Sequence, residues 1–315
     1  MKEEQPLVAI WCLVYNHEPY LRDCFEGFVM QKTNFRFVAI VHDDVSTDKS
    51  ADIIREYAEK YPDIIKPIFE TENQWSKHDG SLDRIMSDAI AATGAKYIAM
   101  CEGDDYWTDP YKLQKQVDFM EGHPDYLMCF HSTSVQNLSS RTAIFDGLLV
   151  ESREYHESDI FPQWRAHLSS FFFRKNLFDM IPSVKQKQWL ESGDTVLILL
   201  AMKYGKVWGI KEVMSVYRMN DNSSMAKKID VEVLGHYIQH LKCFLINFPS
   251  INKNYCYMEI YEYDSMRFWK HDGKNSRWYY LFDMLVWCPK YTIKMWHKWV
   301  KREVKKIIKG KNKQK

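Results

Sequence analysis

The chain has 315 residues, of which 46% are hydrophobic and 27% are charged. This balance is typical of a folded globular protein and excludes a disordered chain, and the length allows one large domain with an addition. The sequence contains no apolar stretch of about eighteen residues, the length that a membrane-spanning helix needs, so we expect no such helix.

Charge is unevenly distributed, although the formal net charge is only +1. Residues 290–315 contain eleven Lys or Arg and one acid, which leaves residues 1–289 with a net charge of about −9. A body of that charge is a poor general nucleic-acid binder, so we expect no nucleic acid among the partners. The seven Cys residues are scattered and show no C-x-x-C spacing, which favours reduced thiols and a cytoplasmic protein.

Strands and helices alternate in the first part of the chain. Continuous apolar runs predict buried strands, and apolar residues at helical spacing predict helices between them. The expected strands are 7–14, 35–41, 64–69 and 97–100, and the expected helices are 20–30, 46–62 and 80–93. This alternation predicts an α/β fold, with a Rossmann-like, mostly parallel central sheet and ligands at the carboxyl ends of its strands.

The pattern changes after Pro110. We expect a helix at 113–120, a strand at 127–132, a polar connection at 137–161, and strands at 169–174 and 207–217 on either side of a helix at 195–204. The sequence becomes aromatic and helical from about residue 226. The predicted organisation is a domain of residues 1–225, with halves 1–105 and 106–225, followed by a helical C-terminal extension, 226–315.

Polar clusters stand at three of the predicted strand ends. They are Tyr15-Asn16, Asp43-Asp44 and Glu102-Gly103-Asp104-Asp105, and they should converge at one edge of the sheet. Carboxylates crowded in this way repel one another and resist burial unless they are solvated or neutralised by a cation. Carboxylates with an open side suit Mg²⁺ or Mn²⁺ that also holds a phosphate group, whereas the alternative is a solvated acidic turn.

Four short motifs stand at the ends of predicted strands and helices, in a defined order along the chain. V-Y-N-H-E-P-Y-L follows the first strand, H-D-D-V-S-T-D the second and E-G-D-D-Y-W-T-D-P the fourth, and E-S-G-D-T precedes a helix that ends in Y-G-K. In this order and spacing, the chain from about Leu7 to Arg218 resembles a family 2 glycosyltransferase of the GT-A fold. The resemblance implies an inverting enzyme with a nucleotide-diphosphate sugar donor, usually a UDP-sugar, and a Mg²⁺ or Mn²⁺ ion.

The resemblance also assigns roles around the nucleotide. Leu13 and Tyr15 would lie beside the base, and Asp44, next to Asp43, would accept a hydrogen bond from a pyrimidine N–H. The alternative for the two acids is to supply negative charge near a helix N-terminus. The family's common Arg-Asn pair is replaced by other residues, which leaves Arg84 or Lys77 to contact the diphosphate.

Glu102-Gly103-Asp104 stands where the family has its D-x-D motif. By the resemblance, Glu102 would serve the ribose or a metal-bound water, and Asp104, with Asp105 as a further candidate, would ligate the cation. Gly103 would let the backbone approach the diphosphate. Two departures from the family bear on this site: Val45 stands where Gly is usual after the paired acids, and Asn220 where a His near the metal is common.

Asp194 is the expected general base, with Glu191 in reserve. In an inverting transfer, such a carboxylate removes the proton of the acceptor hydroxyl while the metal stabilises the departing diphosphate. The alternative for Asp194 is to cap the helix that it opens. Trp107, beside the acids, and Arg218 are the expected acceptor contacts.

The C-terminal segment has the pattern of a basic amphipathic helix. Residues 291–308 carry one apolar stripe with lysines largely off it, which suits the headgroup region of an anionic membrane. The alternative is a helix docked on the acidic body of the same protein.

We therefore expect a cytoplasmic enzyme, peripheral on the inner face of the plasma membrane. It would transfer a sugar to a hydroxyl of a glycan or lipid-linked acceptor in cell-surface polysaccharide synthesis. A non-catalytic relative that binds nucleotide or glycan is one alternative. A sugar nucleotidyltransferase is another, disfavoured because no Gly-rich phosphate loop follows the first strand.

Overall fold

The computed structural model describes residues 5–138, 145–160, 166–185, 193–219, 231–270, 277–294 and 296–297. The chain divides into two compact units. The first unit comprises residues 1–183 and 193–226, and the second comprises residues 184–192 and 227–315.

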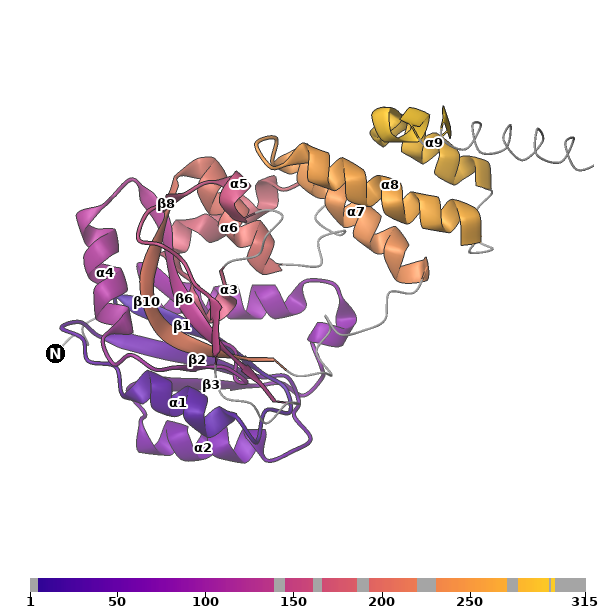
Figure 1. The fold of residues 1–315 in the computed structure, drawn as a ribbon. Helices are drawn as coiled ribbons and strands as arrows, with labels where there is room; N and C mark the ends of the chain where they lie inside the picture. The colour runs from indigo at the N-terminus through magenta and orange to yellow at the C-terminus, as the bar shows by residue number, and fades with distance from the viewer. Residues whose placement is uncertain are drawn as a thin grey trace, which may run out of the picture. The chain divides into compact units, whose positions relative to one another are not determined.

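The first half of the sheet is parallel. Its strands are β1 (Val8–Val14), β2 (Phe37–Asp43), β3 (Ile65–Phe69) and β4 (Tyr97–Met100), in the spatial order β3-β2-β1-β4. The connecting helices are α1 (Leu21–Val29), α2 (Ser50–Lys60) and α3 (Ser81–Thr93). The chain steps outward from β1 to β3 and then returns past β1 to β4. Because parallel crossovers are right-handed, α1 and α2 lie on one face and α3 on the other, as Figure 1 shows.

The second half of the sheet mixes both directions. β6 (Tyr126–Asn137) and β10 (Lys206–Met219) are parallel to each other, and β9 (Phe172–Arg174) joins β6 to β4 with antiparallel pairing on both sides. Three short antiparallel strands complete it: β5 (Tyr106–Trp107), β7 (Phe145–Leu148) and β8 (Glu154–Tyr155). The α/β prediction is confirmed, and the sheet as a whole is mixed.

Helices and short 3-10 turns fill the remaining connections. They are α4 (Lys112–Gly122), α5 (Glu157–Ile160), α6 (Gly193–Tyr204), and the 3-10 helices η1 (Trp75–Lys77), η2 (Leu168–Ser170) and η3 (Lys175–Ser183). The segment 137–161, expected to be a polar connection, contains β7, β8 and α5 among its described residues. The register of β10 against β6 shifts between Ile210 and Val213 and again before Ser215, so bulges bend this strand on its way to the acidic motif.

Val45 adopts a backbone conformation that its side chain disfavours. Its φ is +64°, in the left-handed region, where a β-branched residue is strained and glycine is not. This strain gives a physical reason for the glycine that the family usually has here. Asn16 also has a positive φ, +58°, but Asn tolerates it, and its side-chain oxygen accepts the Thr47 N–H at 2.7 Å.

Val45→Gly is expected to stabilise the first unit by about 1 kcal/mol, since relief of the strain outweighs the greater chain entropy of glycine. The measurement is the urea midpoint of unfolding at constant m. Val45→Ala is the matched control, and because it retains a Cβ it should gain less. A midpoint for Val45→Gly at or below the wild-type value would mean that contacts of the valine side chain outweigh its strain.

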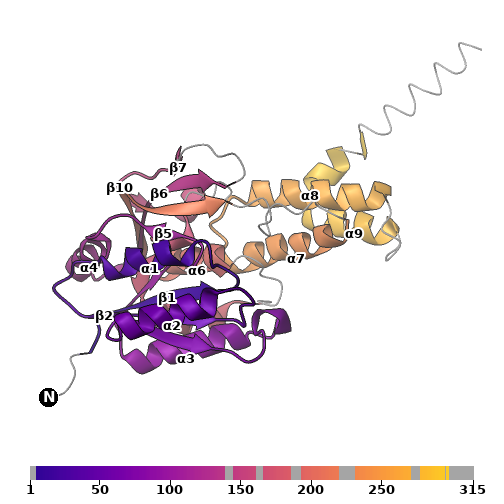
Figure 2. The same ribbon diagram turned by 90° about the horizontal axis from the view of Figure 1, so that it is seen from below.

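The second unit is helical. Its helices are α7 (Val231–Asn247), α8 (Lys253–Lys270) and α9 (Arg277–Trp287), drawn from orange to yellow in Figure 1 and Figure 2. The C-terminal helical extension is thereby confirmed. Its core holds a buried ion pair between Lys242 of α7 and Asp283 of α9. Within the described residues, none of the helices is both long and apolar enough to cross a membrane. Most of the basic tail, residues 298–315, lies outside the described residues.

Candidate active site

Backbone hydrogen bonds hold three strand ends together. Beyond the last paired residues of the sheet, Asp44 N–H donates to the Val14 carbonyl at 3.0 Å, and Gly103 N–H donates to the Leu13 carbonyl at 2.9 Å. The segments that follow β1, β2 and β4 therefore leave the sheet side by side. The polar residues that follow these strands meet at one edge of the first unit.

Gly103 is required by close packing. A Cβ atom at this position would lie 2.8 Å from His17 Nδ1 and 3.0 Å from side-chain atoms of Leu21 and Val14. His17, which the sequence analysis did not single out, therefore lies directly against the acidic motif. Burial lowers the pKa of His17, although the charges of Asp104 and Asp48 act in the opposite direction.

The pKa of Glu102 is raised by burial and by two other carboxylates. Burial raises its pKa to about 8, and the charges of Asp104 and Asp194 add to the effect. Asp194 comes from the first turn of α6, about ninety residues later in the chain. Two other predicted site residues, Asp104 and Asp194, therefore lie near enough for their charges to act on Glu102.

Asp194 is itself partly buried at the start of α6. Its Oδ1 accepts the Thr195 N–H at 2.7 Å, so it also serves the N-terminal turn of the helix. Burial raises the pKa of Asp194, while this hydrogen bond acts against the shift. A carboxylate with a raised pKa at the rim of an acidic cluster is suited to accept a proton. Glu191, the reserve candidate, lies outside the described residues.

Asp104 and Asp105 point to different surroundings. Oδ1 of Asp104 is buried and has no hydrogen-bond partner in the described part of the chain. Asp105 is buried against β10, where Oδ1 accepts the Arg218 N–H at 2.8 Å and Oδ2 lies 3.5 Å from His167 Nδ1. Burial, followed by the charge of Asp104, raises the pKa of Asp105 well above its usual range. Asp104 therefore has an unpartnered oxygen available to a cation, whereas Asp105 is held against β10.

Arg218 holds the acidic loop in place. Its guanidinium donates to the Asp104 carbonyl at 3.1 Å, pairs with the Asp23 carboxylate and lies 4.3 Å from the centre of the Tyr106 ring. The Arg218 side chain is buried, and its guanidinium already has these partners. The expected contact between Arg218 and the acceptor therefore does not fit the structure.

Trp107 belongs to the core. Its side chain is only 2% exposed, its Nε1 donates to the Ser169 carbonyl at 2.9 Å, and Lys112 Nζ lies 4.0 Å from its ring centre. The prediction that Trp107 contacts the acceptor is wrong, because the indole is buried in the core and its N–H group already has a partner there.

The paired acids after β2 also differ. Both oxygens of Asp44 accept backbone N–H groups at the start of η1, from Gln74 at 2.6 Å and Trp75 at 3.0 Å. Asp43 is buried, and its Oδ1 has no partner among the described residues. The first acid of the pair therefore keeps a free acceptor, whereas the second shapes the neighbouring loop.

The remaining predicted nucleotide contacts lie around this edge. Leu13 is half-buried, and Tyr15 is half exposed just beyond β1. Arg84 is exposed in the first turn of α3, where Nη1 donates to the Asp79 carbonyl at 3.0 Å. This bond is at the surface and leaves the guanidinium accessible.

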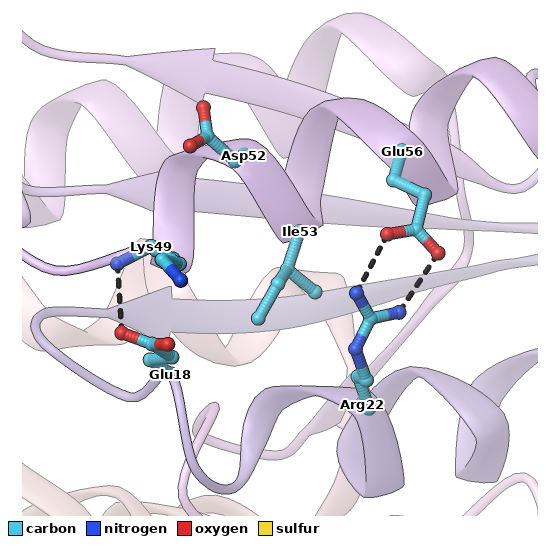
Figure 3. Close-up of a pocket in the computed structure, with 6 residues that line it drawn as sticks. All are labelled: Glu18, Arg22, Lys49, Asp52, Ile53 and Glu56. Carbon is cyan, nitrogen blue, oxygen red and sulfur yellow. Dashed lines mark hydrogen bonds and ion pairs between the residues drawn. The ribbon is translucent and has the colours of Figure 1, made fainter.

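A separate charged pocket of about 330 Å³ lies between α1 and α2 (Figure 3). The Arg22 guanidinium spans it with two hydrogen bonds to Glu56, at 2.8 and 2.7 Å. None of the predicted site residues lines it; its lining residues are Glu18, Arg22, Lys49, Asp52, Ile53 and Glu56.

Metal binding depends on which carboxylate oxygens are available as ligands. Within the described ranges, no three His, Cys, Asp or Glu side chains are grouped closely enough to hold a metal ion. A bound cation would nonetheless give the unpartnered oxygen of Asp104 a ligand and would lower the raised pKa of Glu102. Two carboxylates with an open side fit an ion that also needs phosphate oxygens.

Parts of this chain are similar in sequence to known proteins. An uncharacterised protein of Mycobacterium bovis is 41% identical over 128 residues, which cover 41% of this chain and 35% of that protein. A putative teichuronic acid biosynthesis glycosyltransferase of Bacillus subtilis, TuaG, is 30% identical over 120 residues, 38% of this chain and 44% of the relative. The matches thus span 35% and 44% of the length of these two relatives.

The fold recurs in a solved structure of Staphylococcus aureus TarS in complex with UDP-GlcNAc. It aligns with a TM-score of 0.56 at 15% identity, over 83% of this chain and 72% of that chain. At this identity the likeness shows the fold, and it confirms the predicted GT-A architecture of the first unit.

The family model described as "Glycosyl transferase family 2" matches residues 11–180, more than half of the chain. The matched range contains the strand ends after β1, β2 and β4, where the polar motifs meet. With the family's motifs on the elements where its fold requires them, the chain belongs to glycosyl transferase family 2.

Proposed function

We propose that the first unit transfers a sugar, with inversion, from a nucleotide-diphosphate donor to a hydroxyl of a glycan or lipid-linked acceptor. The observation that supports this proposal is that the polar segments after β1, β2 and β4 leave the sheet side by side, where the charges of Asp104 and Asp194 act on Glu102. Burial of neighbouring carboxylates is unfavourable in the unliganded protein. A metal ion bound together with a diphosphate donor would neutralise their charge.

The nucleotide would lie over the ends of β1 and β2. Tyr15 offers an exposed ring and Leu13 an apolar side chain beside a base. Asp43 has the unpartnered oxygen that an N–H of a pyrimidine could use, while Asp44 holds the loop at η1. Arg84 would exchange its exposed contacts with Asp79 for the diphosphate. The UDP-GlcNAc complex of TarS supports UDP as the first nucleotide to test.

The metal would be Mg²⁺ or Mn²⁺. Asp104 would hold it directly and Glu102 directly or through water, whereas Asp105, turned into β10, is a weaker candidate. When bound, such an ion supplies positive charge to the departing diphosphate. His17 beside Gly103 would help to close the site against water on the α1 side.

Asp194 would act as the general base. It would take the proton of the acceptor hydroxyl as that oxygen forms a bond to the anomeric carbon and the bond to the diphosphate oxygen breaks. This single displacement inverts the anomeric centre and needs no covalent intermediate. The raised pKa of Asp194 increases its basicity for that step.

The acceptor would be a cell-surface polysaccharide precursor, handled on the cytoplasmic side. The similarity to the putative teichuronic acid glycosyltransferase supports this class of acceptor. The donor sugar and the linkage would be set in the half of the domain that contains residues 106–225.

A thermal-shift panel of UDP-, GDP- and dTDP-sugars, with and without Mn²⁺, tests the donor. Ligand binding raises the apparent melting temperature by mass action, so a UDP-sugar should raise it in the presence of metal, and the other nucleotides should raise it less. Binding without release of UDP in the presence of candidate acceptors would favour a non-catalytic relative. No shift with any donor would contradict the proposal.

A further inference from the structure

α9 exposes an apolar face. Trp278 is 72% exposed and Phe282 67%, and Leu285 and Val286 are also exposed. These four residues, here called the α9 face, fall at spacings of four, seven and eight residues and therefore share one side of the helix. The opposite side packs into the second unit through Tyr280, Leu281 and Met284, which are buried.

Positive charge adjoins this apolar surface. In the helical turns after α9, Lys290 and Lys294 are exposed beside an exposed Ile293. Residues 290–315 contain eleven Lys or Arg and a single acid. Apolar residues that include Trp and Phe, followed at once by a strongly basic segment, complement a surface that is apolar below and anionic above.

We propose that the α9 face inserts into the headgroup region of an anionic lipid bilayer, with Lys290 and Lys294 attracted to its charge. An interfacial helix binds through buried apolar area together with attraction to anionic lipids, and each element is present here. The proposal does not depend on the identity of the donor or the acceptor.

Flotation of the full chain with lipid vesicles tests the proposal. The wild-type protein should float with vesicles of phosphatidylcholine and phosphatidylglycerol, and much less with phosphatidylcholine alone or at high salt. Trp278→Gln combined with Phe282→Gln should weaken binding by at least about tenfold, because two large apolar side chains no longer enter the interface. Lys290→Gln combined with Lys294→Gln should weaken it on the anionic vesicles only.

Trp75→Gln is the matched control, because Trp75 is similarly exposed, at 65%, but belongs to the first unit. It should float like the wild type. The proposal is overturned if the wild-type protein fails to float, or if the Trp278/Phe282 variant floats equally well. It is also overturned if sedimentation shows an oligomer that this double substitution dissociates, since the α9 face would then join copies of the chain. Unchanged circular dichroism of the variants excludes misfolding as the cause of a loss.

Discussion

Asp194→Asn is expected to lower the turnover number for sugar transfer by about 10²- to 10⁴-fold, the range over which a general base contributes. The amide has nearly the same shape as the carboxylate and can still accept the Thr195 N–H through its oxygen, so α6 should remain in place. What is lost is the group that accepts the acceptor's proton. Release of UDP in the presence of acceptor measures the rate, and the donor-induced thermal shift shows whether binding survives.

The pH profile distinguishes a base from a structural aspartate. Only the ionised form of Asp194 accepts a proton, and burial raises its pKa, so kcat/KM should rise with pH through a value above that of an ordinary aspartate. The residual activity of Asp194→Asn should lack this rise. Asp179→Asn, which changes an exposed acid on η3, should keep both the rate and the profile. Wild-type activity in Asp194→Asn would place the base elsewhere.

Asp104→Asn is expected to separate stability from activity. Transfer should fall by about 10³-fold or more, because the metal loses its charged ligand and the departing diphosphate loses its counter-charge. The Mn²⁺-induced rise in melting temperature should also disappear. Without metal, however, the variant should be more stable than the wild type by about 1 kcal/mol, because one of three crowded carboxylates is gone.

The extra stability of Asp104→Asn should depend on pH. Glu102 has a folded-state pKa raised from 4.5 to about 8, so folding in the wild type becomes less favourable as pH rises through that interval. Asp104 is one cause of the shift, and its removal should reduce the loss, so the gap between variant and wild type should widen from about pH 5 to 8. Asp88→Asn, an exposed acid on α3, is the control and should show no such gap. A metal-free variant that is less stable than the wild type at pH 8 would contradict the crowding.

β1, β2 and β4 could be predicted from the sequence because they are buried on both faces, whereas β3, at the edge of the sheet, is largely exposed. Buried parallel strands appear as continuous apolar runs, and β1 and β4 were located to within a residue in this way. β7 and β8 were not foreseen, because short strands at the edge of a sheet carry too few residues for a periodic signal. β9 was expected to begin earlier, but serine hydroxyls favour the local 3-10 turn of η2 there.

For the site, the motifs predicted which segments approach one another but not how each side chain points. The charges of Asp104 and Asp194 act on Glu102, whereas Asp105 and Trp107 turn into the β10 side of the sheet. This turn depends on where β10 returns, more than a hundred residues later, and local sequence does not encode it. His17 was visible in the first motif, but its contact with Gly103 depends on the packing of α1 against the end of β4.

The bonds of Arg218 tie the evolution of the two halves of the domain to each other. Because its backbone N–H binds Asp105 and its guanidinium binds the Asp104 carbonyl, a slip of one residue in β10 would present Tyr217 or Met219, neither of them cationic, to the acid loop. An insertion or deletion in this strand therefore preserves these bonds only if the irregular stretch between Ile210 and Ser215 accommodates the change in length. Remodelling of β10 that keeps Arg218 on the acid loop is therefore confined to the residues before Ser215.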